Sequence, residues 1–253
     1  MAGMVPFAWD DPFNLDAELT EEERMIRDAA HAFAQGELQP RVIENFSKEV
    51  DDPELFPMMG EAGLLGLSMP EEDGGMGGDY RHEVVLMRQL GWKGADHFGI
   101  SLHNAIVAPY IWHYGTEEQK AEWLPRLAAG EIACFGLTEP GSGSDSAAMQ
   151  TTAMKDGNGY VLNGSKRYIT NAPFAKLGLI MARTSKEALP KNAHVSAFLV
   201  DMEKAGVSVG KPDKKMGQEG SQIADIYLDD VHVDGDALLG GEEGQGFRTA
   251  MMS

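Results

Sequence analysis

The residues best suited to chemistry form a short stretch in which an apolar segment passes directly into a polar loop. Residues 134–145 read Cys-Phe-Gly-Leu-Thr-Glu-Pro-Gly-Ser-Gly-Ser-Asp, so glycines, hydroxyls and two carboxylates follow the apolar residues. A loop of this composition exposes backbone N–H groups and lets a ligand approach closely. The stretch has neither the lysine spacing of a phosphate-binding P-loop nor the G-x-G-x-x-G spacing of a dinucleotide site. It therefore predicts either a ligand-binding loop or an ordinary turn after a strand.

A second stretch combines basic and aromatic residues. Residues 163–171 read Asn-Gly-Ser-Lys-Arg-Tyr-Ile-Thr-Asn, in which a turn leads into a strand that carries Lys166 and Arg167 beside Tyr168. This pattern is typical of a solvated hairpin with one core aromatic, and it would equally suit the floor under a flat ligand. Further glycine-containing turns, at 215–217, 220–221, 238–240 and 244–247, indicate no function when each is taken alone.

Other kinds of active site lack their sequence patterns. The seven histidines include no H-E-x-x-H pair and have no cysteine partner, so we expect no metal site. The G-x-S-x-G elbow of hydrolases does not occur, and Ser142 and Ser144 are expected to be loop donors rather than nucleophiles. Cys134 is the single cysteine and cannot form an internal disulfide, which fits a reducing compartment.

The elements that must position these stretches change type once along the chain, near Gly130. Before this point apolar residues recur at helical spacing, and capping boxes of the form T-x-x-E and T-x-x-Q at Thr20 and Thr116 predict two helix starts. After it, short apolar runs alternate with turn residues, which predicts β-hairpins. One predicted helix starts at residue 20, and further helices are predicted over 52–61, 80–90, 100–114 and 116–129. The predicted strands include 149–155, 160–162, 165–170, 177–182, 195–201, 207–209 and 223–233.

These elements predict an α+β fold. Residues 1–130 are expected to form an all-α helical bundle domain, residues 131–240 a β-barrel or sandwich domain, and residues 241–253 a linker and the start of a further helix.

The charge balance restricts the classes of partner. The formal net charge is −19, which disfavours nucleic acid and anionic lipid. No apolar run approaches the roughly 18 residues that cross a membrane, and the acidic start carries no secretory or transit pattern, so we expect no membrane insertion. If the ligand is anionic, we expect some of the basic residues of the second half to offset its charge, namely Lys166, Arg167, Lys211, Lys214 and Lys215.

Taken together and in this order, the polar loop, the basic strand and the later turns resemble the acyl-CoA dehydrogenase family of FAD-dependent flavoproteins. Residues 114–119 (Tyr-Gly-Thr-Glu-Glu-Gln), 215–217 (Lys-Met-Gly) and 239–247 (Leu-Gly-Gly-Glu-Glu-Gly-Gln-Gly-Phe) continue the resemblance, which covers the chain from about residue 15 to its end. The resemblance implies an N-terminal helical domain and a middle β domain, with the C-terminal four-helix domain of the family absent from these 253 residues.

The resemblance also implies which residues bind. In the family pattern, Phe135, Leu137 and Thr138 would line the flavin ring, with Thr138 donating to its polar edge. Tyr168, which stands where many relatives have tryptophan, would pack on the other side of the ring with Ile169 and Thr170, whose hydroxyl would lie near the reactive flavin nitrogen. Gly143 and Ser144 complete the implied cofactor-binding set, and Ser144 would also contact the thioester end of the substrate.

The implied reaction is α,β-dehydrogenation of an acyl-CoA thioester to a trans-2-enoyl-CoA, as in β-oxidation of fatty or branched acyl-CoAs. A glutamate base removes the α-proton while a hydride passes from the β-carbon to FAD, and by resemblance this base is expected beyond Ser253, so no catalytic residue is assigned. Glu139 is expected to be a structural residue of the loop. The resemblance further implies an acyl-CoA substrate, electron-transfer flavoprotein as partner, a homotetrameric full-length form, and a bacterial cytoplasmic location in preference to the mitochondrial matrix.

Two alternatives remain open on the sequence. The same fold could carry acyl-CoA oxidase or flavin monooxygenase chemistry, which the oxygen reactivity of the reduced flavin would reveal. If 253 residues are the complete chain, it could instead be a binding module without catalytic activity, which would bind acyl-CoA or a protein partner but no flavin.

Overall fold

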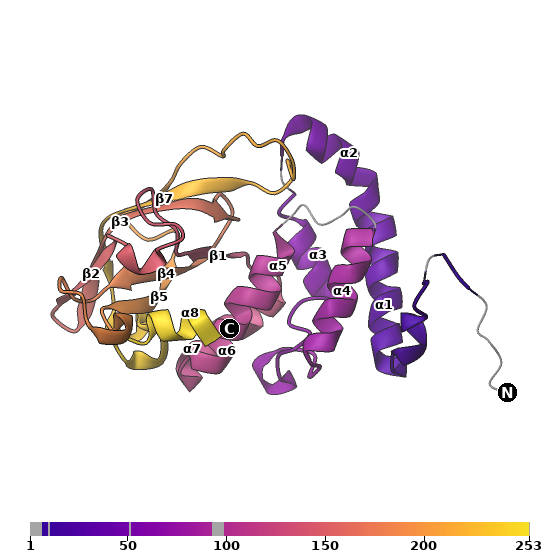
Figure 1. Ribbon diagram of the computed structural model, residues 1–253, viewed down its shortest axis with the longest axis horizontal. Coiled ribbons are helices and arrows are strands. Elements are labelled where there is room, and N and C mark those ends of the chain that lie inside the picture. The colour runs from indigo at the N-terminus through magenta and orange to yellow at the C-terminus, as the bar shows by residue number, and fades with distance from the viewer. Residues whose placement is uncertain (1–6, 10, 51, 93–98, 253) are drawn as a thin grey trace.

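A helical half is followed by a curled β-sheet in the computed structural model, which describes residues 7–9, 11–50, 52–92 and 99–252 (Figure 1). This arrangement confirms the predicted α+β class. Ser253, the last residue of the predicted linker, lies outside the described residues. In Figure 1 the first helices occupy one end of the molecule and the sheet the other, with α5 between them and α6 and α7 below the sheet.

The helical half contains two helices that pack side by side, α1 (Glu21–Phe33) and α4 (Tyr80–Trp92) (Figure 1). Their buried faces meet in a cluster of leucines, phenylalanines and alanines that also includes residues of α3. The remaining α-helices are α2 (Gln39–Lys48), α3 (Leu55–Glu61), α5 (Ile100–Leu102), α6 (Ala108–Tyr114) and α7 (Glu117–Ala128), and α8 (Gly246–Met252) follows the sheet.

Both predicted capping boxes are present. The Thr20 hydroxyl accepts from the N–H of Glu23 at 3.2 Å, and the Glu23 carboxylate accepts from the N–H of Thr20 at 2.7 Å. Thr116 and Gln119 repeat this exchange at the start of α7, at 3.3 and 3.0 Å. Each box satisfies N–H groups that the first helical turn leaves without a carbonyl partner.

One helix was not among the predicted elements. A wide π turn, η2 (Ala34–Leu38), carries α1 directly into α2, which has Pro40 in its first turn. Gly36 and Pro40 interrupt the sequence pattern here, yet the wide turn accommodates both residues without ending the helical path.

The sheet contains seven strands in the order β1-β4-β2-β3-β7-β6, with β5 paired to β4. Most neighbours are antiparallel, as hairpin turns require, but β4 pairs in parallel with β1 and, through Thr152 and Arg183, with β2. The hairpin pattern in the sequence did not indicate these parallel pairs. The strands are β1 (Ala133–Gly136), β2 (Thr152–Asp156), β3 (Gly159–Thr170), β4 (Leu177–Arg183), β5 (Val195–Asp201), β6 (Val207–Val209) and β7 (Ile223–Val233).

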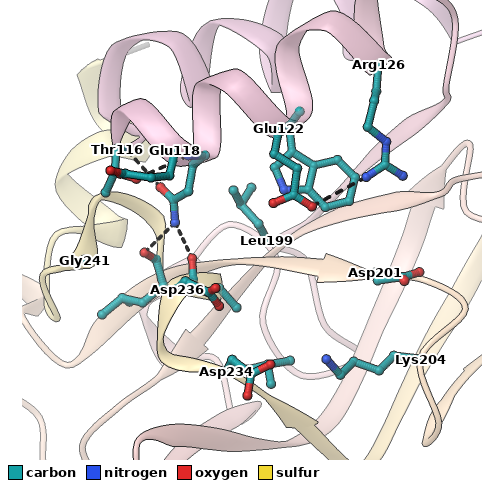
Figure 2. A pocket seen from close by; sticks show the side chains of 15 residues that line it. Thr116, Glu118, Glu122, Arg126, Leu199, Asp201, Lys204, Asp234, Asp236 and Gly241 are labelled. Atoms are coloured by element: carbon teal, nitrogen blue, oxygen red, sulfur yellow. Dashed lines mark hydrogen bonds and ion pairs between the residues drawn. The ribbon is translucent and has the colours of Figure 1, made fainter.

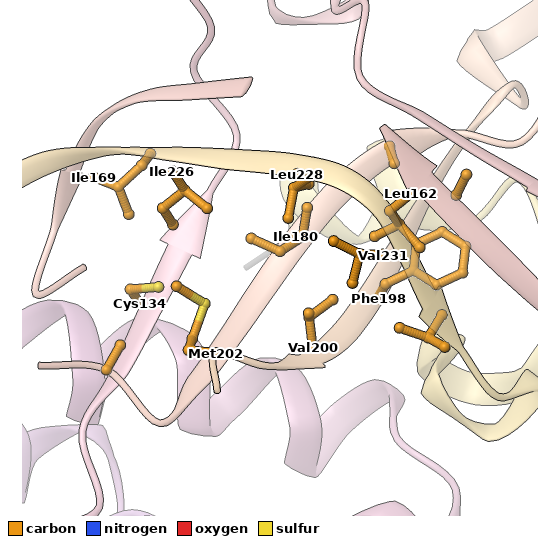
Figure 3. Packing of buried hydrophobic residues seen from close by; sticks show 14 of the residues in the cluster. Cys134, Leu162, Ile169, Ile180, Phe198, Val200, Met202, Ile226, Leu228 and Val231 are labelled. Atoms are coloured by element: carbon orange, nitrogen blue, oxygen red, sulfur yellow. The ribbon is translucent and has the colours of Figure 1, made fainter. Parts of the chain in front are cut away.

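Side chains of β4 and β5 are buried on both faces of the sheet. Ile180 and Phe198 point into the inner core formed within the curl (Figure 3), whereas Leu179 and Leu199 pack with α6 and α7 on the other face. Successive residues of a strand face opposite sides, so each strand contributes to two cores. The helices and the sheet therefore share one continuous interior.

His103 links the helical half to the sheet. It lies in a second π turn, η4 (His103–Val107), and its ring is fully buried. The ring Nε2 donates to the carbonyl of Leu127 at 3.1 Å, and Nδ1 accepts from the N–H of Ala133 at 3.2 Å, so these two contacts require the neutral ring. Burial lowers the pKa of His103 to about 4.

Glu83 of α4 is a buried carboxyl inside the helical half. Its carboxyl accepts from the side-chain amide of Asn104 at 2.6 Å and from the Ser68 hydroxyl at 3.4 Å. The Asn104 carbonyl oxygen in turn accepts from the N–H of Gly66 at 2.7 Å. Burial raises the pKa of Glu83 to about 7, because these neutral donors only partly offset the lost hydration of the charged form.

Acidification is expected to weaken the fold through His103. The unfolded chain takes up a proton near pH 6.5 and the folded chain only near pH 4, so this residue should lower the free energy of unfolding by about 3 kcal/mol between those values. Urea unfolding of the wild type and of His103→Gln, at about pH 7.5, 5.5 and 4, measures the effect. The stability advantage of the wild type should shrink as the pH falls, and an advantage that stays constant would contradict the assignment.

Glu83 is expected to act with the opposite sign. Its folded pKa lies above its unfolded value of 4.5, so the folded state holds the proton more tightly and loses stability as the pH rises from 4.5 to 7. Glu83→Gln keeps an acceptor for Asn104 and carries no charge, so at about pH 8 it should be roughly 1–3 kcal/mol more stable than the wild type. Thermal melts at about pH 8 and 4.5 test this, since the gain should disappear at the lower pH.

Candidate functional site

Strand β1 lies at one edge of the sheet and continues into the polar loop. Phe135 is half-buried, and its ring centroid lies 5.5 Å from that of Tyr110 on α6. Leu137 and Thr138, which follow the strand, are also half-buried. All three side chains are therefore partly accessible to a ligand from this edge.

The polar loop closes on itself in a tight turn. The backbones of Glu139 and Ser142 exchange two hydrogen bonds, at 2.9 and 3.1 Å, and the Ser142 hydroxyl donates to the carbonyl of Asp145 at 2.7 Å. Gly143 and Ser144 lie on the exposed side of this turn. The Ser142 hydroxyl is thus used inside the loop, whereas Ser144 faces solvent.

A bulge in β3 turns Tyr168 outward. The pairing with β7 shifts register between Lys166 and Ile169, and Tyr168 has a φ of 60°, a conformation that non-glycine residues rarely adopt. Its ring is 61% exposed, and the guanidinium of Arg167 lies 4.5 Å from the ring centroid. An exposed aromatic face held in this conformation suits a flat ligand.

The residues next to Tyr168 divide between core and surface. Ile169 is 2% exposed and points into the inner core (Figure 3), so its side chain does not face the outer edge as expected for a ring contact. Thr170 is half-buried. Asn171, with a φ of 69°, donates from its side-chain amide to the carbonyls of Gly99 and Ala133 at 3.1 and 3.2 Å.

Backbone and side-chain bonds bring the loop and the bulge together. The N–H of Arg167 donates to the carbonyl of Thr138 at 2.8 Å, and the Lys166 ammonium donates to the carbonyl of Leu137 at 3.3 Å. The two predicted binding segments therefore meet at one edge, although they are separated in the sequence.

Lys166 and Glu139 form a buried ion pair at this junction. Their charged atoms are 2.7 Å apart, and both side chains are almost completely inaccessible. Burial lowers the pKa of Lys166 to about 8. Burial opposes ionisation of Glu139 as well, but the charge of Lys166 and the donors at Gln150 and Thr151 outweigh it and hold the pKa of Glu139 below its usual value.

The basic residues expected to offset an anionic ligand do not share one environment. Lys166 is fully buried and cannot reach an external phosphate, which corrects the expectation for this residue. Arg167 is paired with Asp225 at 2.7 Å, and Lys215 donates to backbone carbonyls of Gln218 and Ser221. Lys214 is exposed, with its ammonium 3.6 Å from a carboxylate oxygen of Glu49.

A separate hollow of about 570 Å³ lies between α7 and the ends of β5 and β7 (Figure 2). On its wall the Gln119 side chain donates to the carbonyls of Asp236 and Leu238 at 2.5 and 2.9 Å. None of the predicted binding residues belongs to the part of its lining that the structure describes.

Two further searches cover the described ranges only. Within residues 7–9, 11–50, 52–92 and 99–252, no three His, Cys, Asp or Glu side chains group in a way that could hold a metal ion. The helices formed by these residues include none with the length and apolar character needed to cross a bilayer.

Comparison with protein families agrees with this architecture. Residues 20–131 match the model "Acyl-CoA dehydrogenase, N-terminal domain", and residues 134–231 match "Acyl-CoA dehydrogenase, middle domain". The chain belongs to the acyl-CoA dehydrogenase family. This confirms the resemblance that the polar loop and the basic strand carry.

Individual members of the acyl-CoA dehydrogenase family match over most of this chain. It is 36% identical to the human mitochondrial short-chain specific acyl-CoA dehydrogenase, over 99% of this chain and 61% of that protein. An acyl-CoA dehydrogenase structure from Geobacillus kaustophilus aligns with a TM-score of 0.88 at 38% identity, covering 92% of this chain and 61% of that one. A Mycobacterium smegmatis glutaryl-CoA dehydrogenase structure in complex with FADH2 aligns with a TM-score of 0.83 at 33% identity, covering 92% and 58%. The chain thus spans about three fifths of the length of these relatives.

A substitution at Gly136 tests how closely the residues pack where the polar loop meets the β3 bulge. A Cβ atom at Gly136 would lie 2.6 Å from Ile180 Cδ1 and 3.2 Å from Lys166 Cγ, so Gly136→Ala should lower the free energy of unfolding by about 1–3 kcal/mol. Gly143→Ala is the matched control, because no atom lies within 4 Å of its added Cβ, and it should change stability by less than about 0.5 kcal/mol. Urea unfolding of both variants measures the difference, and equal stabilities would contradict the close packing of Ile180 and Lys166 around Gly136.

Proposed function

We propose that the chain carries the FAD site of an acyl-CoA dehydrogenase that oxidises an acyl-CoA thioester to a trans-2-enoyl-CoA. The observation that carries this proposal is the 2.8 Å hydrogen bond from the Arg167 N–H to the Thr138 carbonyl. This bond joins the half-buried residues after β1 to the exposed aromatic of the β3 bulge, and the combination supplies an apolar wall, a flat face and hydroxyl donors at one edge.

Except for Ile169, whose side chain is buried in the core, the predicted residues have surroundings that support a role. Phe135 and Leu137 would cover the apolar part of the flavin ring, and Tyr168 would present its exposed face to the cofactor. The hydroxyls of Thr138 and Thr170 would donate to polar atoms of the ring. When bound, FAD supplies a ring that accepts a hydride.

The exposed turn of the polar loop would serve the remaining contacts. Gly143 and Ser144 lie on the solvent side of this turn, where the Ser144 hydroxyl is free to donate to the thioester carbonyl of an acyl-CoA. Such a donor would favour loss of the α-proton, because it stabilises the negative charge that develops on the carbonyl oxygen.

The catalytic base is not assigned to Glu139. Its carboxylate accepts from Lys166, Gln150 and Thr151 and is buried, so it is held as an anion by structural partners rather than facing a substrate. We propose further that electrons pass to an electron-transfer flavoprotein and that the full-length protein is a homotetramer. The division at residues 130 and 240 also remains a proposal.

The aromatic face of Tyr168 gives the first test of FAD binding. Tyr168→Ala should raise the Kd for FAD about tenfold, because it removes a stacking face worth roughly 1–1.5 kcal/mol, whereas Tyr168→Trp should stay close to the wild type. Tyr80→Ala removes another exposed tyrosine, 74% accessible, on α4 and is the matched control. Fluorescence titration with FAD measures all four proteins, and equal affinity of Tyr168→Ala and Tyr80→Ala would remove Tyr168 from the site.

The reaction itself is tested on protein isolated from its source. Native mass spectrometry gives the chain length and any bound FAD, and anaerobic addition of acyl-CoAs from short to long should abolish the visible absorption of the flavin. No loss of absorption with any chain length would overturn the dehydrogenase proposal. Rapid reoxidation by air with formation of peroxide would instead identify an oxidase.

A further inference from the structure

Lys166 is an unusual residue because its charge is enclosed inside the sheet edge. The side chain is completely buried and runs beneath Gly136, the last residue of β1. A Cβ atom at Gly136 would lie 3.2 Å from Lys166 Cγ and 2.6 Å from Ile180 Cδ1, so the absence of a side chain here gives Lys166 room. The ammonium donates to Glu139 and to the carbonyl of Leu137.

Glu139 also binds a second segment of backbone, at residues 150–151. One carboxylate oxygen accepts from Lys166 at 2.7 Å and from the N–H of Thr151 at 3.0 Å, and the other accepts from the N–H of Gln150 at 2.5 Å. The carboxylate therefore ties the loop after β1 to the residues that enter β2. The side chain of Lys166 is the central cation that keeps this buried carboxylate charged.

Lys166 also belongs to the bulge that turns Tyr168 outward. The next residue, Arg167, bonds to the Thr138 carbonyl through its N–H, so Lys166 and Arg167 hold two successive carbonyls, those of Leu137 and Thr138. The spacing between Thr138 and Tyr168 is thus set by a single short segment of β3. Lys166 lies on the buried side of that segment and does not face the ligand.

We propose that Lys166 is a positioning residue for the flavin: through Glu139 and Leu137 it holds the Thr138 edge in register with Tyr168. This inference rests on the proposed FAD site. The charged groups packed around this segment support the assignment. Glu139 after β1 is the partner of Lys166, whereas Asp225 on β7 and Asp213 before it are engaged by Arg167.

The experiment uses the full 253-residue chain and four variants. Lys166→Met removes the charge while retaining a long side chain, Glu139→Gln removes the opposite charge, and the double variant removes both. Lys176→Met is the matched control, because it breaks an exposed ion pair with Glu203 at another part of the sheet. FAD affinity and the visible spectrum of the bound flavin are measured at about pH 7 and 9, together with hydrogen exchange at the amides of Gln150 and Thr151.

Lys166→Met and Glu139→Gln should each weaken FAD binding at least about tenfold and alter the spectrum of the bound flavin. The double variant should bind more tightly than Lys166→Met, since it leaves no uncompensated buried charge. Burial lowers the pKa of Lys166 to about 8, so the closed edge releases this proton more readily than an opened edge does. Between the two pH values the FAD affinity of the wild type and the protection of the Gln150 and Thr151 amides, corrected for base-catalysed intrinsic exchange, should therefore rise. This pH step should be absent from Lys166→Met and retained by Lys176→Met.

Several outcomes would overturn the proposal. A folded Lys166→Met with the affinity and spectrum of the wild type would show that Lys166 does not position the flavin. If that variant does not fold, a wild-type affinity and a corrected amide protection that do not change between pH 7 and 9 would refute the proposal on their own. If the wild type and Lys176→Met bind no FAD at either pH, the proposed function fails and this inference fails with it.

Discussion

The contact between Lys166 and Glu139 is the constraint on which the edge of the sheet depends. A buried ammonium or carboxylate is strongly unfavourable unless an opposite charge and further hydrogen bonds compensate it. Here three donors surround the carboxylate of Glu139, and two acceptors surround the ammonium of Lys166. Because each partner compensates the other, the loop after β1 has one well-determined position relative to β3.

Ala133 fixes this edge to the helical half. Its N–H donates to the ring of His103, and its carbonyl accepts from the side chain of Asn171, which also bonds to Gly99 at the start of α5. One residue of β1 therefore receives contacts from the helices and from the end of β3. The interface between the two halves therefore fixes the position of the proposed site. How precisely that position is fixed depends on neutral polar groups that are fully buried.

The local elements could be predicted from the sequence, but which strands pair with one another could not. The Thr20 and Thr116 capping boxes and strands β2, β4, β5, β6 and β7 follow from residue type and spacing, and the structure confirms them. The predicted turn at 163–164 was wrong, because these residues form an irregularity within the continuous strand β3. The pairing of β1 with β4 could not be predicted, because the two strands are joined by other strands and the contact depends on the tertiary fold. Helix α2 was not predicted, because Gly36 interrupts the helical pattern in the sequence, whereas in the structure the π turn continues the helix through this residue.

The candidate site shows the same division. The polar loop and the basic strand could be identified as candidate binding segments, but the direction of individual side chains could not be predicted. A lysine beside an exposed tyrosine is expected to be exposed as well, and only the bulge explains why Lys166 points inward while Tyr168 points outward. The same shift of register places Ile169 in the core, so the pattern of alternation could not be extended from one side of the bulge to the other.

The parallel pair of β1 and β4 has a consequence for the order in which the molecule folds. β4 is completed on one side by its hairpin with β5, a contact between neighbours in the chain, whereas β1 must close a long loop that contains β2 and β3 before it can pair. Loop closure of this length is entropically unfavourable until the other strands are in place. We therefore expect the β4–β5 hairpin to form before β1 docks, so that this edge of the sheet is completed after the hairpin beside it.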